Sequence, residues 1–209
     1  MKDVMVLTGA GQIGLAIARR MGSGKKIVVG DAKREKALAA CNVMNEAGFD
    51  AVPVEMDLSS RASILNLIHE AQGYGDIAML VNAAGVSPSQ APIETILKVD
   101  LYGTAVLLEE VGKVIKEGGV GVTISSQSGH RMPALGIEVD EELATSPTEE
   151  LLELEVLQAA NIRDTLHAYQ MAKRCNVKRV MAEAVKWGAR GARINSIGGA
   201  LGQEPDRLG

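Results

Sequence analysis

Short apolar runs alternate with longer amphipathic segments along the first part of the chain, and this alternation limits the fold more than any other sequence feature. The apolar runs have the length and the Val, Ile and Leu content of buried strands, and they are residues 4–7, 27–29, 52–56, 77–81 and 120–125. The segments between them have helical periodicity, and they are residues 13–21, 33–47, 61–71 and 93–116. Strands that alternate with helices form βαβ units. We therefore predict an α/β fold: a three-layer, Rossmann-type, doubly wound parallel sheet with helices on both faces.

The alternation then breaks at segment 131–165, which is rich in Asp and Glu. We predict that this segment is an acidic helical insertion before the next long helix. Ser146, Pro147 and Glu149 fit a capping box, with the serine as N-cap, the proline at the first helical position and the glutamate reaching back. A short helix through Leu157 should follow.

The rest of the chain is predicted to complete the sheet. A long helix at residues 167–187 follows the insertion, and a sixth strand at residues 193–197 follows that helix. Residues 198–209 are rich in glycine and charge and are typical of a loop. A chain of 209 residues fits one domain, so we assign residues 1–209 to a single domain.

Composition argues against two classes of partner. Aromatic residues make up 2% of the chain and its formal net charge is -4, whereas nucleic-acid-binding proteins use aromatic stacking and basic surfaces. No apolar stretch approaches the ~18 residues of a transmembrane helix, and the N-terminus has no signal-peptide pattern. We therefore predict a soluble, cytoplasmic protein with no nucleic-acid or membrane partner and no metal site. Cys41 and Cys175 are expected to be free thiols rather than a disulfide.

Gly9, Gly11 and Gly14 follow the first predicted strand and open the first helix. In a dinucleotide-binding loop, one glycine forms the turn, a second lets the backbone approach the pyrophosphate, and a third lets the helix pack on the strand. The phosphates then lie at the helix N-terminus. Asp31 ends the second strand about 20 residues on, where a carboxylate binds the adenosine ribose hydroxyls. The alternative role of Asp31 is a helix N-cap.

The same aspartate bears on the choice of cofactor. Asp31 favours NAD over NADP, because the 2′-phosphate of NADP would face a like charge. Lys33 and Arg34 follow closely, however, and could bind that phosphate. We therefore predict NAD as the cofactor, with NADP as the alternative.

Tyr169 and Lys173 lie four residues apart in the predicted helix 167–187, so their side chains share one face. A free tyrosine has a pKa near 10, and a nearby ammonium favours the phenolate. Lowering a tyrosine pKa by about three units takes roughly 4 kcal/mol of differential stabilisation and yields a usable general acid/base. Ser126 ends the fifth strand, at the sheet edge where ligands bind, and could hold a substrate carbonyl oxygen. Alternatively, Ser125 and Ser126 only cap backbone groups.

In this order the motifs resemble the short-chain dehydrogenase/reductase family, over residues 1 to about 197. The residues implied in cofactor binding follow the first four strands and include the tyrosine and lysine of the long helix: they are Thr8, Gly9, Gly11, Gln12, Ile13, Gly14, Asp31, Asp57, Leu58, Asn82, Ala83, Gly85, Tyr169 and Lys173.

The resemblance also implies a mechanism and an assembly. Tyr169 would donate or accept the proton, Ser126 would orient the substrate oxygen, and Lys173 would favour the phenolate and hold the nicotinamide ribose. The cofactor would carry the hydride. The implied reaction is NAD(P)-dependent interconversion of a secondary alcohol and a ketone. Family members commonly assemble through helices equivalent to 93–116 and 167–187, so we expect a homodimer or homotetramer.

The chain departs from the family pattern at four places. The glycine motif is one residue shorter than usual. Asp100 stands among the implied catalytic residues where many members have an asparagine, and its carboxylate lacks the amide donor of a water-mediated proton relay. Segment 131–165 separates Ser126 from Tyr169 far more than is usual, and we predict that it is a lid beside the substrate cleft, with a solvated surface elaboration as the alternative. Residues 198–209 replace the usual loop, helix and seventh strand, so the C-terminus is atypical or incomplete.

Two other functions remain open on the same fold. The chain could be a non-catalytic NAD(P)-binding sensor that presents a surface to a partner. The presence of Ser126, Tyr169 and Lys173 together argues against this, because a sensor needs none of them. A sugar-nucleotide epimerase or dehydratase would reuse the tyrosine and lysine, but it generally needs a larger C-terminal substrate domain.

Overall fold

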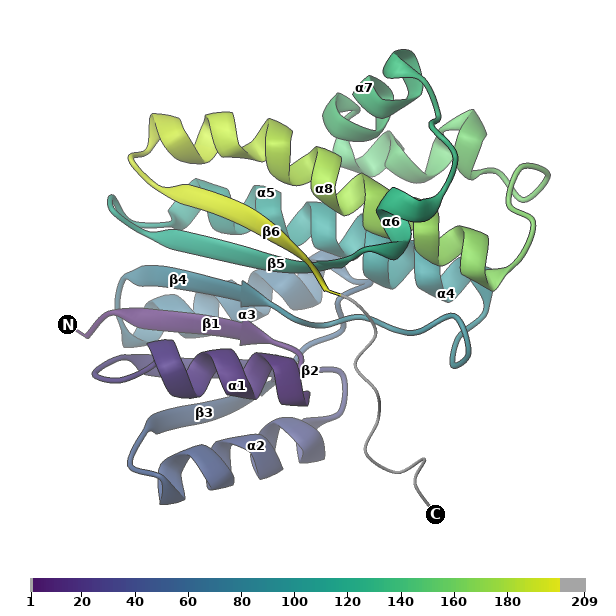
Figure 1. Ribbon diagram of the computed structural model, residues 1–209. Coiled ribbons are helices and arrows are strands. Elements are labelled where there is room, and N and C mark those ends of the chain that lie inside the picture. The colour runs from purple at the N-terminus through teal and green to yellow at the C-terminus, as the bar shows by residue number, and fades with distance from the viewer. Residues whose placement is uncertain (1, 200–209) are drawn as a thin grey trace.

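The computed structural model describes residues 2–199, which form a six-stranded parallel sheet (Figure 1). The strands are β1 (Val4–Thr8), β2 (Lys26–Asp31), β3 (Asp50–Glu55), β4 (Ile77–Asn82), β5 (Val120–Ser126) and β6 (Arg193–Gly199). Their order in the sheet is β3-β2-β1-β4-β5-β6, and every pairing is parallel. The order reverses between β1 and β4, which creates the switch point where ligands bind in open α/β sheets. The predicted fold class is confirmed.

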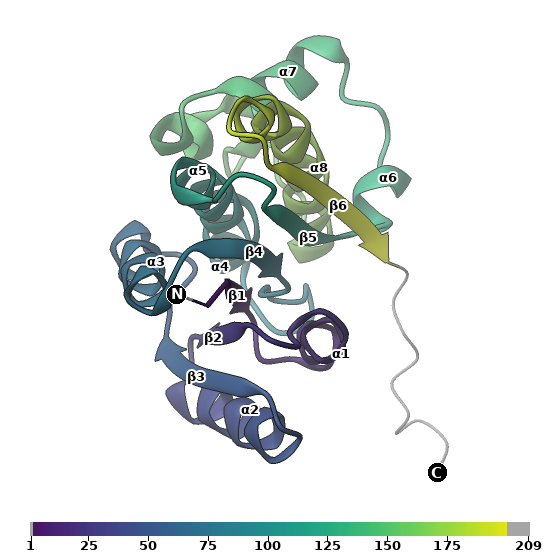
Figure 2. The same cartoon turned by 90° about the vertical axis from the view of Figure 1, so that its left-hand side faces the viewer.

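Helices cover both faces of the sheet, as Figure 2 shows. One face carries α1 (Gln12–Met21) and α2 (Arg34–Glu46), and the other carries α3 (Arg61–Tyr74), α5 (Thr104–Val114) and α8 (Thr165–Ala189). The other helical elements are short, and they are α4 (Ile93–Ile96), η1 (Leu97–Gly103), α6 (Ser128–Arg131), α7 (Ile137–Thr145), η2 (Thr148–Glu153) and η3 (Glu155–Leu157).

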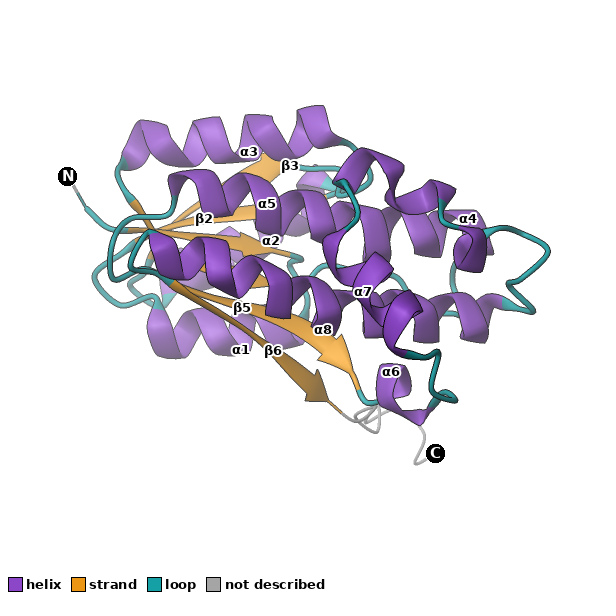
Figure 3. Cartoon of the chain, turned by 90° about the horizontal axis from the view of Figure 1, so that it is seen from above, coloured by secondary structure: helices purple, strands orange, loops and turns teal. Residues whose placement is uncertain are grey.

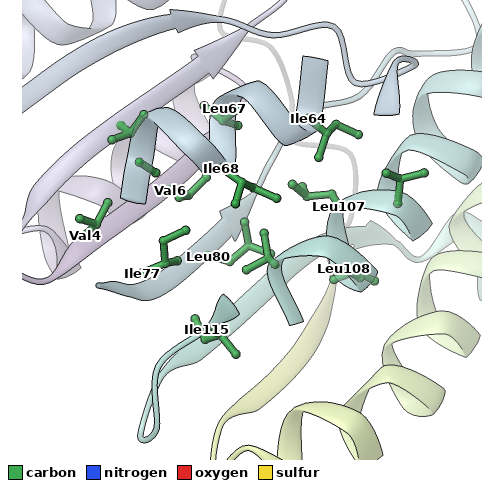
Figure 4. Packing of buried hydrophobic residues seen from close by; sticks show 14 of the residues in the cluster. Val4, Val6, Ile64, Leu67, Ile68, Ile77, Leu80, Leu107, Leu108 and Ile115 are labelled. Carbon is green, nitrogen blue, oxygen red and sulfur yellow. The ribbon is translucent and has the colours of Figure 1, made fainter. Parts of the chain in front are cut away.

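The central strand β1 shows why its sequence is apolar at nearly every position. Val4 and Val6 lie in the core beneath α3 and α5, which Figure 4 shows at close range. Met5 and Leu7 lie in the core beneath α1 and α2. A strand whose two faces are both covered buries every side chain, so its sequence does not alternate.

Trp187 fixes the long helix α8 against α5 and the sheet. Its side chain is fully buried, and its Nε1 donates a hydrogen bond to the carbonyl oxygen of Leu108 at 3.1 Å. A Cβ at Gly112 would lie 2.5 Å from Trp187 Nε1, and a Cβ at Gly121 would lie 2.9 Å from the ring. The indole therefore fills space that two glycines leave open.

The insertion 131–165 contains a helix, α7, that the sequence did not predict. Leu143 of α7 is buried with Leu151 and Leu157 in an apolar cluster that includes Met171 of α8. Figure 3 shows α6 and α7 beside α8, near the end of the sheet to which β5 and β6 point. The segment thus packs on α8 through buried apolar side chains and does not lie wholly in solvent.

The predicted capping box in this segment is wrong. Pro147, not Ser146, precedes a 3₁₀ helix, and no side-chain cap hydrogen bond forms there. Glu149 does not reach back; its Oε1 lies 2.6 Å from Arg61 Nε, and its carboxylate accepts from the Tyr102 hydroxyl. A guanidinium offers a carboxylate a stronger, charge-assisted partner than a backbone N–H.

Two further boundaries differ from expectation. The predicted helix 93–116 is interrupted by η1, a π-helical segment that contains Asp100. Such segments are rare and occur frequently at functional sites. Gly198 and Gly199, expected in a loop, pair with Ser125 and Ser126 as the end of β6. The rest of the atypical C-terminus, residues 200–209, lies outside the described residues.

Candidate active site

The loop after β1 gives each of its glycines a separate role. Gly9 has a φ of +86°, and a Cβ there would lie 2.6 Å from the backbone nitrogen of Ala84. A Cβ at Gly14 would lie 2.7 Å from the Gly9 oxygen and 2.9 Å from the Leu7 side chain, so α1 packs closely on β1. At Gly11 a Cβ would meet no atom within 4 Å, and this residue is exposed. Gly11 therefore leaves open the space through which a phosphate would approach the backbone.

The N-terminus of α1 faces the same opening. Gly11 is the N-cap, with no side-chain cap hydrogen bond and no acidic residue in the first turn. Gln12 and Ile13 are exposed, and their N–H groups precede the first intrahelical bond, from Leu15 to Gly11. These N–H groups and the positive end of the helix dipole suit an anion. The loop and the helix together fit the pyrophosphate of a dinucleotide.

Asp31 supports the glycine loop from the end of β2. Its Oδ2 accepts a hydrogen bond from the Ala10 N–H at 3.0 Å, and its Oδ1 accepts from the Lys33 N–H at 3.0 Å. The N-cap of α2 is Lys33, so the alternative N-cap role for Asp31 is wrong. A carboxylate has about four acceptor positions. Asp31 can therefore brace the loop and still accept from ribose hydroxyls.

Thr8 and Asn82 are buried at the carboxyl ends of β1 and β4, and they hold these strands together rather than form an exposed contact surface. The Thr8 hydroxyl donates to Asn82 Oδ1 at 2.7 Å, and Asn82 Nδ2 donates to the hydroxyl of Thr104 on α5 at 3.3 Å. The Ala83 N–H continues the sheet by donating to the Thr8 carbonyl at 2.9 Å. These bonds hold β1 and β4 in register where the cofactor is expected.

Asp57 and Leu58 shape the loop after β3. Asp57 Oδ1 accepts from the N–H of Ser59 at 2.8 Å and from its hydroxyl at 2.7 Å, which forms the turn into α3. Leu58 is buried, and its carbonyl lies so close to Gly103 that a Cβ there has no room. Contact of either residue with a cofactor stays a prediction.

The helix α8 brings Tyr169 and Lys173 together, as their spacing predicts. Lys173 Nζ lies 5.2 Å from the centre of the Tyr169 ring. Lys173 is only 5% exposed, and Tyr169 is half-buried. The two side chains therefore lie together in surroundings that are largely shielded from water.

The end of β5 is fastened to the turn of α8 that carries Lys173. The Ser125 hydroxyl donates to the Lys173 carbonyl at 2.9 Å, and a Cβ at Gly129 would lie 2.6 Å from the Arg174 nitrogen. Ser126 Oγ accepts from the Ser128 N–H at 3.2 Å. Both serines thus bond backbone groups, as the alternative interpretation proposed. Because Ser126 Oγ is the acceptor in this bond, its O–H donates to no other described residue and can donate to a substrate oxygen.

Asp100 lies against Lys173 from η1. It is 1% exposed; its Oδ1 accepts from the Val86 N–H at 2.8 Å, and its Oδ2 lies 3.3 Å from Lys173 Nζ. Within residues 2–199 this Oδ2 has no well-aligned hydrogen bond, so its contact with Lys173 is an ion pair. Burial raises the pKa of Asp100 above its ordinary value, against the opposing effects of Lys173 and the Val86 N–H.

Sequence reasoning missed the partners of Asp100. Val86 acts through its backbone, which no side-chain pattern reveals. Gly85, expected at the cofactor, lies over the carboxylate: a Cβ there would be 3.1 Å from Asp100 Oδ1. The apolar neighbours Val99 and Leu101 were the one available signal that Asp100 is buried.

Residues 3–138 match the family model described as short chain dehydrogenase. This chain belongs to the short-chain dehydrogenase family. The short-chain dehydrogenase/reductase bsc3 of Alternaria brassicicola is 36% identical to it over 205 residues, which cover 98% of this chain and 74% of that protein. Tropinone reductase-like 3 of Erythroxylum coca is 28% identical over 142 residues, which cover 63% of this chain and 55% of that protein.

Solved structures of other short-chain dehydrogenases share the fold. One from Mycobacterium smegmatis superimposes with a TM-score of 0.73 at 19% identity, over 96% of this chain and 77% of that one. An NAD⁺-bound xylitol dehydrogenase gives a TM-score of 0.71 at 20% identity, over 95% of this chain and 70% of that one.

Family membership makes this short-chain dehydrogenase an oxidoreductase, and the family generally uses NAD or NADP. Between residues 2 and 199, no helix combines the length and the apolar character that crossing a membrane requires. In the same range, His, Cys, Asp and Glu side chains form no cluster of three or more that could hold a metal ion.

Proposed function

We propose that this short-chain dehydrogenase interconverts a secondary alcohol and a ketone with NAD or NADP as the hydride carrier. The observation that carries the proposal is the Tyr169–Lys173 pair, with Lys173 Nζ 5.2 Å from the ring centre, next to the end of β5 that holds Ser126. Relatives named as dehydrogenases and reductases support it.

Each of the three side chains has a distinct role in the proposed reaction. During oxidation, the Tyr169 phenolate takes the proton of the alcohol hydroxyl, and during reduction the phenol returns it to the carbonyl oxygen. The Ser126 O–H donates to the same substrate oxygen and orients it. The buried ammonium of Lys173 stabilises the phenolate. NAD(P), when bound, supplies or takes up the hydride.

The glycine loop and the start of α1 would hold the pyrophosphate, and Asp31 would hold the adenosine ribose. We propose a preference for NAD, because the Asp31 carboxylate would repel a 2′-phosphate. The exposed Lys33 and Arg34 would favour NADP instead. Thermal-shift titration decides between them: NAD should raise the midpoint of unfolding at lower concentration than NADP.

We also propose that segment 131–165 forms one wall of the substrate cleft. Its support is the apolar cluster in which Met132, Leu143 and Ile162 pack with α8, and against which Tyr169 lies. A wall held by buried side chains can exclude water from the reacting atoms.

The test of the function replaces one hydroxyl group. Tyr169→Phe should lower kcat on a panel of secondary alcohols and ketones by at least ~100-fold, since general acid/base catalysis contributes that much or more. Its affinity for the cofactor should stay within about twofold of the wild-type value. Tyr74→Phe is the matched control, because Tyr74 lies on α3 with its ring against Lys26 and the substitution keeps the ring.

Two results would contradict the proposal. Turnover by Tyr169→Phe at the wild-type rate would remove Tyr169 from the chemistry. Tight cofactor binding by the wild-type protein without turnover of any panel member would favour the non-catalytic sensor.

A further inference from the structure

We infer that Asp100 is the counterion of Lys173, and that through Lys173 it sets the pH range in which Tyr169 works. Asp100 is thus a positioning residue, acting on the tyrosine by way of the lysine. The inference rests on the proposed function, because it concerns the same acid/base group.

The first support is the pair of donors that meet at Asp100. The Val86 N–H donates to Oδ1 at 2.8 Å, and Lys173 Nζ lies 3.3 Å from Oδ2. A carboxylate offers an acceptor oxygen to each donor, whereas the amide of an asparagine offers one oxygen and turns an NH₂ group toward the second donor. The surroundings of residue 100 therefore suit an aspartate better than the asparagine common in the family.

The second support is the enclosure of the pair. The Asp100 side chain is 0% exposed and that of Lys173 is 7% exposed. Gly85 lies over the carboxylate, so that even a Cβ would crowd both oxygens, at 3.1 and 3.2 Å. Opposite charges interact strongly in such surroundings and are little screened by salt. Removing one partner would leave the other charge buried and unpaired.

The third support is that the neighbouring charges are engaged elsewhere. Glu94 of α4 pairs with Lys98 of η1 at the surface. Tyr102 of η1 bonds to Glu149 of η2. On α7 and α8, Asp140 pairs with Arg174 and Lys178, and Glu183 pairs with Lys186. Arg179 Nη2 donates to the carbonyl oxygen of Ser146, and the buried Cys175 Sγ lies 3.6 Å from the Leu143 carbonyl oxygen. His167 of α8 and His130 and Arg131 of α6 are exposed or half-exposed.

The consequence follows from the charges around Lys173. An ammonium by itself favours the Tyr169 phenolate, but an adjacent carboxylate cancels part of its field at the phenol oxygen. With Asp100 charged, the phenolate therefore forms at higher pH than it would beside an uncompensated lysine. Asp100→Asn should therefore move that ionisation to lower pH.

The experiment uses the ultraviolet difference absorption of the phenolate in cofactor-free protein. The chain has three tyrosines, and subtracting the titration of Tyr169→Phe isolates the signal of Tyr169. The second readout is the acidic limb of the pH profile of kcat/KM for alcohol oxidation, which reports the base of the free enzyme. The control is Asp50→Asn, which removes the same charge from a carboxylate of the edge strand β3 that contacts Lys2 and Lys26.

We expect both readouts to move to lower pH in Asp100→Asn. In Asp50→Asn, both should stay at the pH of the wild-type protein. An unshifted phenolate titration, or one shifted to higher pH, overturns the inference even if activity falls, because Asp100 would then be only structural. Asp100→Ser replaces Asp100→Asn if denaturation curves show that the latter is unfolded. The titration needs no turnover, so its outcome is separate from the test of the proposed function by Tyr169→Phe.

Discussion

Two substitutions in the glycine loop, at Gly14 and at Gly11, should distinguish the effect of packing from the effect of ligand binding. Gly14→Ala places a Cβ 2.7 Å from the Gly9 carbonyl oxygen and 2.9 Å from the Leu7 side chain, and neither the loop backbone nor β1 can yield cheaply. Gly11→Ala places a Cβ where no protein atom lies within 4 Å, with a φ of -80° that any residue adopts. The first change should affect folding, and the second should affect the cofactor.

The magnitudes follow from these contacts. Overpacking at Gly14 costs about 1–3 kcal/mol, against which alanine gains up to about 1 kcal/mol in helix propensity. A net loss of about 1–2 kcal/mol should lower the melting temperature by roughly 2–8 °C for a domain of this size. At Gly11, a weaker N-cap and a less flexible unfolded chain oppose each other, so stability should change by less than about 0.5 kcal/mol.

Cofactor affinity should show the reverse order. A methyl group at Gly11 occupies the path of the pyrophosphate, and we expect a loss of at least about tenfold in affinity, or about 1.4 kcal/mol. The assays are urea denaturation of the cofactor-free proteins and calorimetric titration with NAD. Wild-type affinity in Gly11→Ala would show that the pyrophosphate does not lie against this loop, and wild-type stability in Gly14→Ala would refute the packing argument.

Two further predictions concern ionisation and thiols. Burial disfavours charge on Glu109, but its bonds to Thr148 and Lys113 and the charge of Arg61 outweigh this and lower its pKa to about 2. Because the folded pKa lies below the ordinary value of 4.5, the contribution of Glu109 to stability is complete above that value and is lost as the pH falls from 4.5 to about 2. After allowance for solvent screening, this contribution amounts to about 1 kcal/mol. The difference in unfolding free energy between wild type and Glu109→Gln should therefore narrow from pH ~7 to pH ~3. A difference that does not depend on pH would contradict this. Burial raises the pKa of Cys41 to about 11 and of Cys175 to about 12, so neither thiol should react in the native protein and both should react after unfolding without reductant. Fewer than two reactive thiols in the unfolded chain would indicate a disulfide.

Local patterns in the sequence were sufficient for the fold and for much of the candidate site. A strand buried on both faces must be apolar throughout, which is why β1 and its neighbours could be predicted from their short apolar runs. Residues four apart on a helix share a face, so the proximity of Tyr169 and Lys173 follows from their spacing. The glycine roles follow in the same way, because each depends on backbone only a few residues away.

The insertion shows where local patterns fail. Ser146, Pro147 and Glu149 have the spacing of a capping box, yet Glu149 bonds to Arg61, which is distant in the sequence. A cap is worth about 1 kcal/mol, and a charged partner elsewhere in the fold competes with it. Tertiary contacts of this kind leave no periodic signal in the sequence.

The sequence alone determined the six strands, the main helices between them and the side chains that end at the carboxyl edge of the sheet, because those properties depend on neighbours within one helical turn or one strand. Only the tertiary structure decided that Asp100 is buried against Lys173 and beneath Gly85, since three separate segments must converge to enclose the carboxylate. The physical reason is that burial and charge pairing are properties of the packed assembly, and no stretch of chain carries them by itself.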